Sequence, residues 1–198
     1  MSIATNIIRS EHRAIGAVIH GLRYLLQEIR ERHAAPRFDV MKAMLYYIDT
    51  FPERLHHPKE DRYLFSRLRA RTRAADEALD RLEEQHRRGA QMIRELEQAL
   101  LRYEQGGPAH FASFDLCVEQ YADFHWQHMR EEEDLILPLA EQTLTASDWA
   151  EIDAAFSGHA DPLIGEQLQR NYEALFSRIV ALAPPPIGVG PQHRDTTE

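Results

Sequence analysis

Residues 56–60 read His56-His57-Pro58-Lys59-Glu60, and residues 128–132 read His128-Met129-Arg130-Glu131-Glu132. Both stretches place a glutamate four residues after a histidine. Side chains at this spacing lie on one face of a helix, one turn apart. Because both stretches interrupt faces that are otherwise apolar, each predicts a pair of metal-type ligands directed into the core of a helical protein.

Apolar residues recur at helical spacing over roughly 3–33, 39–70, 75–104 and 109–142, and prolines and glycines fall between these stretches. The short connections make neighbouring helices antiparallel. The chain is therefore predicted to be all-α, an up-down-up-down four-helix bundle with a short C-terminal helical extension. Pro52 and Pro58 lie inside the second stretch and are expected to kink it or locally reset it.

Three segments are predicted along the chain: the bundle over 1–143, the helical extension over 144–183, and a disordered tail over 184–198. The extension begins with Thr145-Ala146-Ser147-Asp148, which resembles a capping box, and a last helix is expected over about 166–182. The extension either closes one end of the bundle or forms a homodimer contact.

Composition and charge limit the partners and the cellular compartment that can be expected for this protein. The formal net charge is -9, so nucleic acid is not expected as a partner. Cys117 is the only cysteine, which rules out an intramolecular disulfide and suits a reducing compartment. Neither a signal peptide nor a membrane-spanning apolar stretch is recognised, so the protein is expected in the cytoplasm. Five arginines at the end of the second stretch are expected to be solvated: Arg62, Arg67, Arg69, Arg71 and Arg73.

The other two helical stretches each carry a histidine at a matching height. His12 and His86 lie about 10 residues after the first residue of their helical stretches. The two histidine–glutamate pairs lie about 10 residues before the last residue of the second and fourth stretches. In an antiparallel bundle these side chains meet in one layer, about 15 Å from one end. The predicted metal ligands are therefore His12, His56, Glu60, His86, His128 and Glu132.

Six imidazole and carboxylate ligands exceed the needs of one tetrahedral zinc ion and suit iron or manganese. Two ions bridged by the two glutamates fit the count. His57 and Asp61 share the spacing of His56 and Glu60 but point about 100° away, and they stay open as the alternative pair. His125 is expected at the rim, and Glu131 and Glu133 in solvent.

A ferritin-like di-iron carboxylate protein is the rival metal class. Glu53 and His56, and Glu83 and His86, both match the Glu-x-x-His pattern of those proteins. That pattern leaves His12 and His128 without a role.

At this point the chain resembles the hemerythrin-like proteins, also called the HHE cation-binding domain, over about residues 5–142. The resemblance rests on Ser10-Glu11-His12, His56 to Asp61, Glu84-Gln85-His86 and His128 to Glu133. It implies a four-helix bundle around a centre of two non-haem iron ions joined by an oxo or hydroxo bridge. It also implies that the four histidines are terminal ligands and that Glu60 and Glu132 bridge the ions.

One departure from the family bears on function. Oxygen-carrying hemerythrins use a fifth histidine one turn from the third-helix ligand, where this chain has Leu82 and Ala90. The remaining set is similar to that of bacterial iron–sulfur-repair proteins and of an iron-sensing ubiquitin-ligase domain. The departure implies an open position near His86 for a small diatomic or peroxide ligand, so the expected function is to bind or reduce oxygen, peroxide or nitric oxide. A non-catalytic sensor of iron or oxygen is the alternative.

Overall fold

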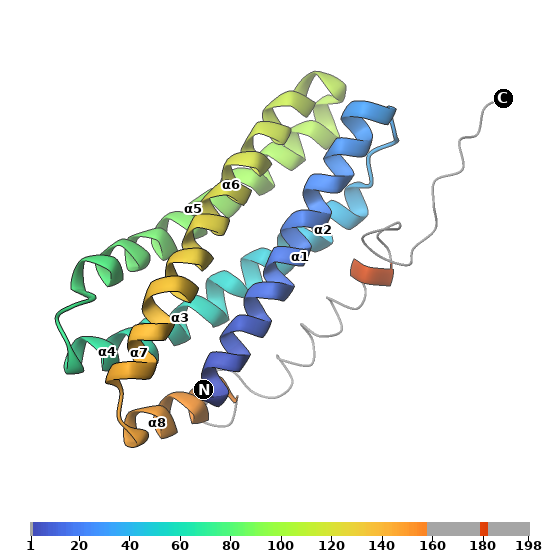
Figure 1. The fold of residues 1–198 in the computed structure, drawn as a ribbon. Coiled ribbons are helices and arrows are strands. Elements are labelled where there is room, and N and C mark those ends of the chain that lie inside the picture. The colour runs from blue at the N-terminus through green and yellow to red at the C-terminus, as the bar shows by residue number, and fades with distance from the viewer. Residues whose placement is uncertain (1, 158–178, 182–198) are drawn as a thin grey trace.

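The computed structural model describes residues 2–157 and 179–181, and within these ranges every element is helical. The all-α prediction is thus confirmed. Most of the helix predicted over 166–182, and the tail predicted over 184–198, lie outside the described residues. Four helical runs lie side by side (Figure 1), and each contacts two others, so that they enclose a common interior.

The predicted helical stretches agree with the four runs to within a few residues. The first run is α1 (Ile3–Arg32) and the third is α5 (Asp76–Gly106). The second run consists of α2 (Phe38–Thr50), η1 (Pro52–His56), α3 (His57–Lys59), η2 (Glu60–Phe65) and α4 (Ser66–Arg71). The fourth consists of η3 (Pro108–His110), α6 (Phe111–Glu131), η4 (Glu132–Ile136) and α7 (Leu137–Thr143). Helix α8 (Ala146–Phe156) is the last element described up to residue 157.

Local signals in the sequence set the ends of α1. The Ser2 hydroxyl accepts a hydrogen bond from the backbone N–H of Thr5 at 3.0 Å, which satisfies one of the free donors at the helix start. At the other end His33 adopts φ 54°, a left-handed conformation that turns the chain out of the helix. Between these ends, residues such as Ile8, Ile15 and Leu22 form a buried apolar face.

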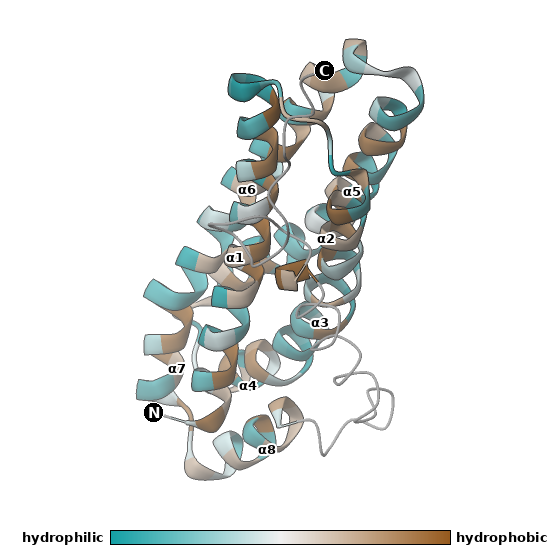
Figure 2. Cartoon of the chain, turned by 90° about the vertical axis from the view of Figure 1, so that its right-hand side faces the viewer, coloured by the Kyte–Doolittle hydropathy of each residue, from teal (hydrophilic) through white to brown (hydrophobic). Residues whose placement is uncertain are grey.

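Two separate apolar clusters form the core. One is built by α1, α2, α5 and α6, with Ile19, Ile48 and Phe114 among its buried members. The other lies toward the end that carries α4, α7 and α8, and includes Ile8, Phe65 and Ile136. Figure 2 shows hydrophobic residues gathered on the sides of the helices that face one another. A layer of buried polar side chains belongs to neither cluster.

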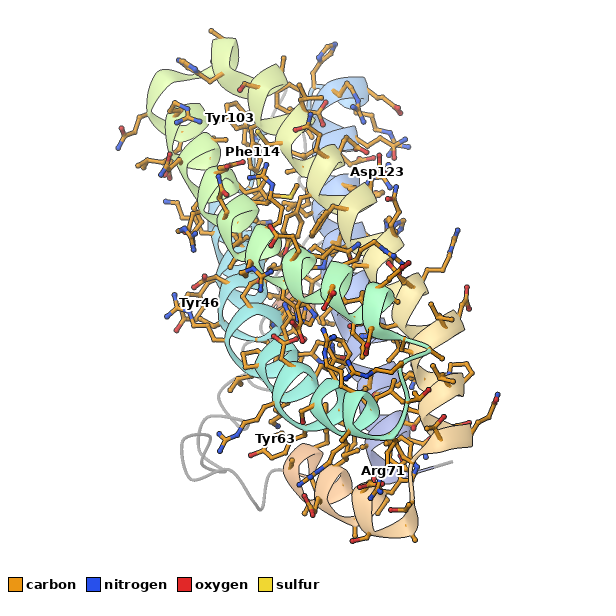
Figure 3. All side chains as sticks on the ribbon, turned by 90° about the vertical axis from the view of Figure 1, so that its left-hand side faces the viewer. Tyr46, Tyr63, Arg71, Tyr103, Phe114 and Asp123 are labelled. Carbon is orange, nitrogen blue, oxygen red and sulfur yellow. The ribbon has the colours of Figure 1, made fainter. Side chains whose placement is uncertain are left out.

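Helix α8 lies across one end of the helical runs (Figure 1) and is tied to them by polar contacts. Arg71, labelled in Figure 3, donates two hydrogen bonds to Asp148, at 2.8 and 3.0 Å, and Arg67 pairs with Glu151. The backbone N–H of Ala4 donates to Asp153 at 2.7 Å. Two of the five arginines that were expected to be solvated, Arg67 and Arg71, therefore also hold α8 in place.

The predicted capping box at the start of α8 is confirmed. The Thr145 side chain accepts from the backbone N–H of Asp148, and the Asp148 carboxylate accepts from the backbone N–H of Thr145. The same carboxylate accepts from Arg71, and this guanidinium, together with the hydrogen bonds from Thr145, holds the pKa of Asp148 well below its usual range.

Replacing Thr145 with alanine should lower the free energy of unfolding by about 1 kcal/mol, because the backbone donor at the start of α8 loses its acceptor. Urea unfolding of the full chain measures this difference. Ser147→Ala is the matched control, since Ser147 is an exposed residue of the same helical turn with no capping role. Equal stabilities for the two variants would contradict the assignment of the cap.

Candidate metal centre

The six predicted ligand residues come together inside the four helical runs. His12 lies on α1, His86 on α5 and His128 on α6, while His56, Glu60 and Glu132 lie on η1, η2 and η4. All six side chains are buried, and His86 is the most exposed of them at 6%. They lie between the two apolar clusters, so the surrounding residues shield them from bulk water.

Three of these residues lie on π-helical segments, in which backbone hydrogen bonds span five residues instead of four. The N–H of His57 donates to the carbonyl of Pro52, and the N–H of Leu137 donates to the carbonyl of Glu132. Prolines at 52, 58 and 138 accompany these segments, since each removes a backbone donor and its ring crowds the preceding turn. The wider turns accommodate an extra residue, which changes the face that each following side chain presents.

The donor atoms form two groups that share Glu60 and Glu132. In the first group, His12 Nε2 lies 3.1 Å from His56 Nε2 and 3.2 Å from Glu132 Oε2, and His56 Nε2 lies 3.4 Å from Glu60 Oε1. Ligand atoms bound about 2.1 Å from one ion are separated by about 3 Å when they are neighbours. The donor atoms of the first group are therefore spaced like neighbouring ligands of one ion.

The second group uses the other oxygen of each carboxylate. His86 Nε2 lies 3.7 Å from Glu60 Oε2 and 3.6 Å from Glu132 Oε1. His128 Nε2 lies 3.4 Å from the same Glu132 oxygen. Each glutamate thus directs one oxygen to one pair of imidazoles and the second oxygen to the other pair. This is the arrangement expected of two bridging carboxylates.

The Nδ1 atom of each of these histidines is bonded to an acceptor in the surrounding protein. His12 donates to Glu133 at 2.9 Å and His56 to Glu11 at 2.8 Å. In the second group, the acceptors are Asp61, 2.7 Å from His86 Nδ1, and Gln85, 2.9 Å from His128 Nδ1. Because Nδ1 is the donor in each case, Nε2 is available as the ligand atom, and the ring orientation is fixed.

Several buried polar atoms at the centre have no hydrogen-bond partner among the described residues. They are both carboxylate oxygens of Glu60 and of Glu132, together with Nε2 of His86 and of His128. Leaving such atoms unpaired costs free energy, and an ionised carboxylate is especially costly to bury. A bound cation would pair with all of them, so the donor set fits a metal.

The charges at this site interact strongly. Burial raises the pKa of Glu60 well above its ordinary value, and the nearby Glu132 carboxylate raises it further. Burial acts against the charged form of His12, but the hydrogen bond to Glu133 and the negative charges of Glu132 and Glu133 outweigh it and raise the pKa of His12 to about 9. Burial also acts against the charged form of His86, but the hydrogen bond to Asp61 and the charges of Asp61 and Glu132 outweigh it and raise the pKa of His86 to about 9. Two imidazoles of raised pKa therefore lie beside the buried carboxylates.

Of the two carboxylates left open on the second run, Glu60 belongs to the groups of donor atoms and Asp61 does not. Glu60 points into the centre, whereas Asp61 is partly exposed and accepts from His86 Nδ1. The ferritin-like interpretation is wrong, because Glu83 is a partly exposed partner of Arg69 and does not reach the centre.

Sequence reasoning missed three residues around the centre. Glu133, expected in solvent, is partly exposed, but its carboxylate also accepts a hydrogen bond from His12. His125 was expected at the rim but is buried, 3.7 Å from Glu53. His57 was expected to point away, yet it is also buried, and burial lowers its pKa to about 3. The ring of His57 lies beside that of His86, with the ring centres 4.2 Å apart.

The profile of the hemerythrin HHE cation-binding domain matches residues 3–140. The chain belongs to the hemerythrin family. This domain binds metal cations, and the present chain supplies buried groups of histidine and glutamate placed for that purpose. Comparison with curated proteins gives no match, and neither does comparison with solved structures. Among the described residues of this hemerythrin domain, no helix combines the length and apolarity needed to cross a membrane.

The metal-free domain should become less stable as the pH rises from about 6.5 to about 9. The pKa of His12 and of His86 is about 9 in the folded protein, against an ordinary value of 6.5. Their ion pairs therefore stabilise the fold fully below pH 6.5, and this stabilisation is lost as the pH rises to about 9. Urea unfolding of chelator-treated protein at several pH values measures this. In metal-loaded protein the ligand imidazoles are neutral and the decline should vanish. Rising stability of the metal-free form over this window would show that these ion pairs are absent.

Proposed function

We propose that the domain holds two non-haem iron ions and uses them to bind or reduce a small molecule such as oxygen, peroxide or nitric oxide. His12 and His56 would hold one ion, His86 and His128 the other, and Glu60 and Glu132 would bridge them. The observation that carries the proposal is the opposed orientation of the carboxylate oxygens, one toward each imidazole pair. Six nitrogen and oxygen donors exceed the four ligands that a zinc ion usually takes, and such a mixed set suits iron.

The protein's own residues would perform three tasks at this centre. The apolar clusters on either side limit the access of water. The acceptors on each Nδ1 hold the rings in the ligand orientation and raise their basicity. We take the four helical runs to form the up-down-up-down bundle of the family. In this arrangement the helical runs hold all donors in one layer. Iron held by these residues would supply the capacity to exchange electrons with a small ligand, which the protein side chains lack.

The setting proposed for this activity is the cytoplasm, because a lone cysteine suits a reducing compartment. The proposed partner is the small ligand itself. The acidic net charge of -9 disfavours nucleic acid.

A second candidate is a non-catalytic sensor of iron or oxygen, and contacts of α8 support it. This helix packs against η2, the segment that carries Glu60. Lys59, the neighbour of Glu60, is buried with its Nζ 5.8 Å from the ring centre of Phe156 on α8. A change in the position of Glu60 on metal loss would therefore alter the packing of α8 against η2.

His86→Ala should lower the iron content from two ions per chain to about one or fewer, because one of its donors is lost and Glu60 and Glu132 are left underneutralised. Metal analysis of purified protein measures the ratio. His33→Ala is the control, since His33 is an exposed residue at the end of α1. Full occupancy in His86→Ala would overturn the assignment of this ligand.

Limited proteolysis separates the two candidate functions. A sensor should show cleavage near α8 at least about 10-fold faster after iron removal, because local opening of that helix becomes more frequent. An enzyme should instead consume many equivalents of peroxide or oxygen per chain in the presence of a reductant. Unchanged cleavage together with repeated turnover would eliminate the sensor.

A further inference from the structure

A further buried carboxylate lies near the metal centre without belonging to its groups of donor atoms. The side chain of Glu53, on η1, is 3% exposed, and its Oε2 atom has no hydrogen-bond partner among the described residues. The Tyr121 hydroxyl donates a hydrogen bond to its Oε1 atom at 3.3 Å. In the described part of the chain, no lysine or arginine pairs with this carboxylate. Glu53 is therefore a buried acidic group that the fold compensates only in part.

Two imidazoles face Glu53, one at each carboxylate oxygen. His57 Nδ1 lies 3.4 Å from Oε2, and His125 Nε2 lies 3.7 Å from Oε1. Both nitrogens are buried and lack a hydrogen-bond partner among the described residues. Ligand atoms bound about 2.1 Å from one ion lie about 3 Å apart, so each oxygen and its imidazole could contact a cation together. Two donor atoms are fewer than a resident ion needs, which suits brief binding rather than storage.

The charge of Glu53 is not matched by its neighbours. Burial acts to raise the pKa of Glu53, but its contacts with His125 and His57 outweigh burial and lower the pKa to about 2. Burial lowers the pKa of His57 to about 3 and raises that of Tyr121 well above its ordinary value. At neutral pH Glu53 is therefore ionised, while neither His57 nor Tyr121 supplies a positive charge. A divalent cation would compensate this buried charge.

Gly89 leaves the space that Glu53 occupies. A Cβ at this position of α5 would lie 2.9 Å from Glu53 Oε1 and 3.3 Å from Oε2, which is too close for ordinary packing. The carboxylate therefore lies in the seam between α5 and the second helical run, which pack against each other. This side of the molecule faces the viewer in Figure 3.

Two further acidic side chains lie along this seam toward solvent. The Asp49 side chain on α2, four residues before Glu53, is 16% exposed, and Glu97 on α5 is exposed. Burial raises the pKa of Glu97 and the negative charge of Asp49 raises it further, whereas Arg54 and Arg94 act in the opposite direction. Arg54 pairs with Asp49 through a side chain that is 68% exposed. Burial thus increases from Glu97 through Asp49 to Glu53.

His57 connects Glu53 to the second ligand group. Its ring centre lies 4.2 Å from that of His86 and 5.1 Å from that of His128. The rings of His57 and His86 are nearly parallel, and the donor group that includes Glu60 does not include His57. His57 therefore lies beside the second group rather than within it, on the side toward Glu53.

We propose that Glu53 is a transit site through which divalent iron enters and leaves the centre, along a row formed by Asp49, Glu53 and His57. This inference rests on the proposed di-iron centre. Acidic side chains at the seam attract the hydrated cation, and Arg54 is exposed enough to give up its place on Asp49. Glu53 then replaces part of the water around the ion at the buried position. A transit residue lowers the barrier in both directions, so it changes loading and release by the same factor and leaves the affinity unchanged.

The test follows iron uptake and release in the full chain. Metal-free protein is mixed with Fe(II) in the absence of oxygen, and a chromogenic chelator measures the unbound iron over time. The same chelator then removes iron from loaded protein. Glu53→Gln, which removes the charge and keeps the side-chain shape, should slow both processes at least about 10-fold. The final iron content should equal that of wild type, because Glu53 does not hold the resident ions.

Two control variants separate transit from a structural role. Glu95→Gln removes the same charge from an exposed position on α5, so both rates should stay within about 2-fold of wild type. Tyr121→Phe removes the hydrogen bond to Glu53 but keeps the carboxylate charge, and its rates should stay within about 3-fold. A merely structural role for Glu53 predicts instead that Tyr121→Phe and Glu53→Gln have similar effects.

Asp49→Asn decides the question should Glu53→Gln fail to fold. Asp49 is partly exposed at the outer part of the row, and its substitution leaves Arg54 there without this partner. Loading and release should therefore both slow by about 3-fold, at unchanged iron content.

The outcomes separate the two proposals. Wild type that binds two irons, together with unchanged rates in Glu53→Gln and Asp49→Asn, overturns the transit site and leaves the di-iron centre standing. Weaker iron binding in Glu53→Gln with loading as fast as in wild type also overturns it, because Glu53 would then hold the resident ions. Wild type that binds no iron pair overturns both proposals. Equal slowing of loading and release at unchanged iron content, with wild-type rates in Glu95→Gln, supports transit through Glu53.

Discussion

The burial of two carboxylates within reach of each other is the constraint on which the rest of the structure depends. Glu60 and Glu132 are both almost completely buried and have no hydrogen-bond partner for any of their oxygens among the described residues. Each buried charge costs several kcal/mol unless it is compensated. Four imidazoles surround the pair, and the pKa values of two of them, His12 and His86, are raised by the neighbouring carboxylates. The proposed pair of metal ions would compensate the carboxylates more completely, because it would contact all four oxygens.

This constraint explains local features that would otherwise weaken the fold. Prolines and π-helical turns interrupt the second and fourth runs where the glutamates enter the core. The residues around the centre also form a ring of Nδ1 acceptors, in which Glu11 and Glu133 lie on different helical runs from the histidines they hold. The apolar clusters on either side then provide the packing that the polar layer cannot.

Much of the fold could be predicted from the sequence, because helical periodicity and the breaks at Pro36 and Gly107 are local signals. The convergence of His12, His56, His86 and His128 followed from their heights in antiparallel helices. His57 was not predictable in this way, because its place beside His86 depends on how the second and third helical runs pack together. Nor were the roles of Glu133 and His125 accessible, since they depend on which neighbour from another run lies beside them.

The central claim is that the opposed carboxylates hold a pair of iron ions between two sets of imidazoles. A crystal structure of iron-loaded protein with anomalous scattering measured at the iron absorption edge tests it most directly. The account predicts two neighbouring peaks, with Glu60 and Glu132 contacting both and one imidazole group on each side. Absence of a peak in this layer, or a single peak that contacts only one imidazole group, would contradict it.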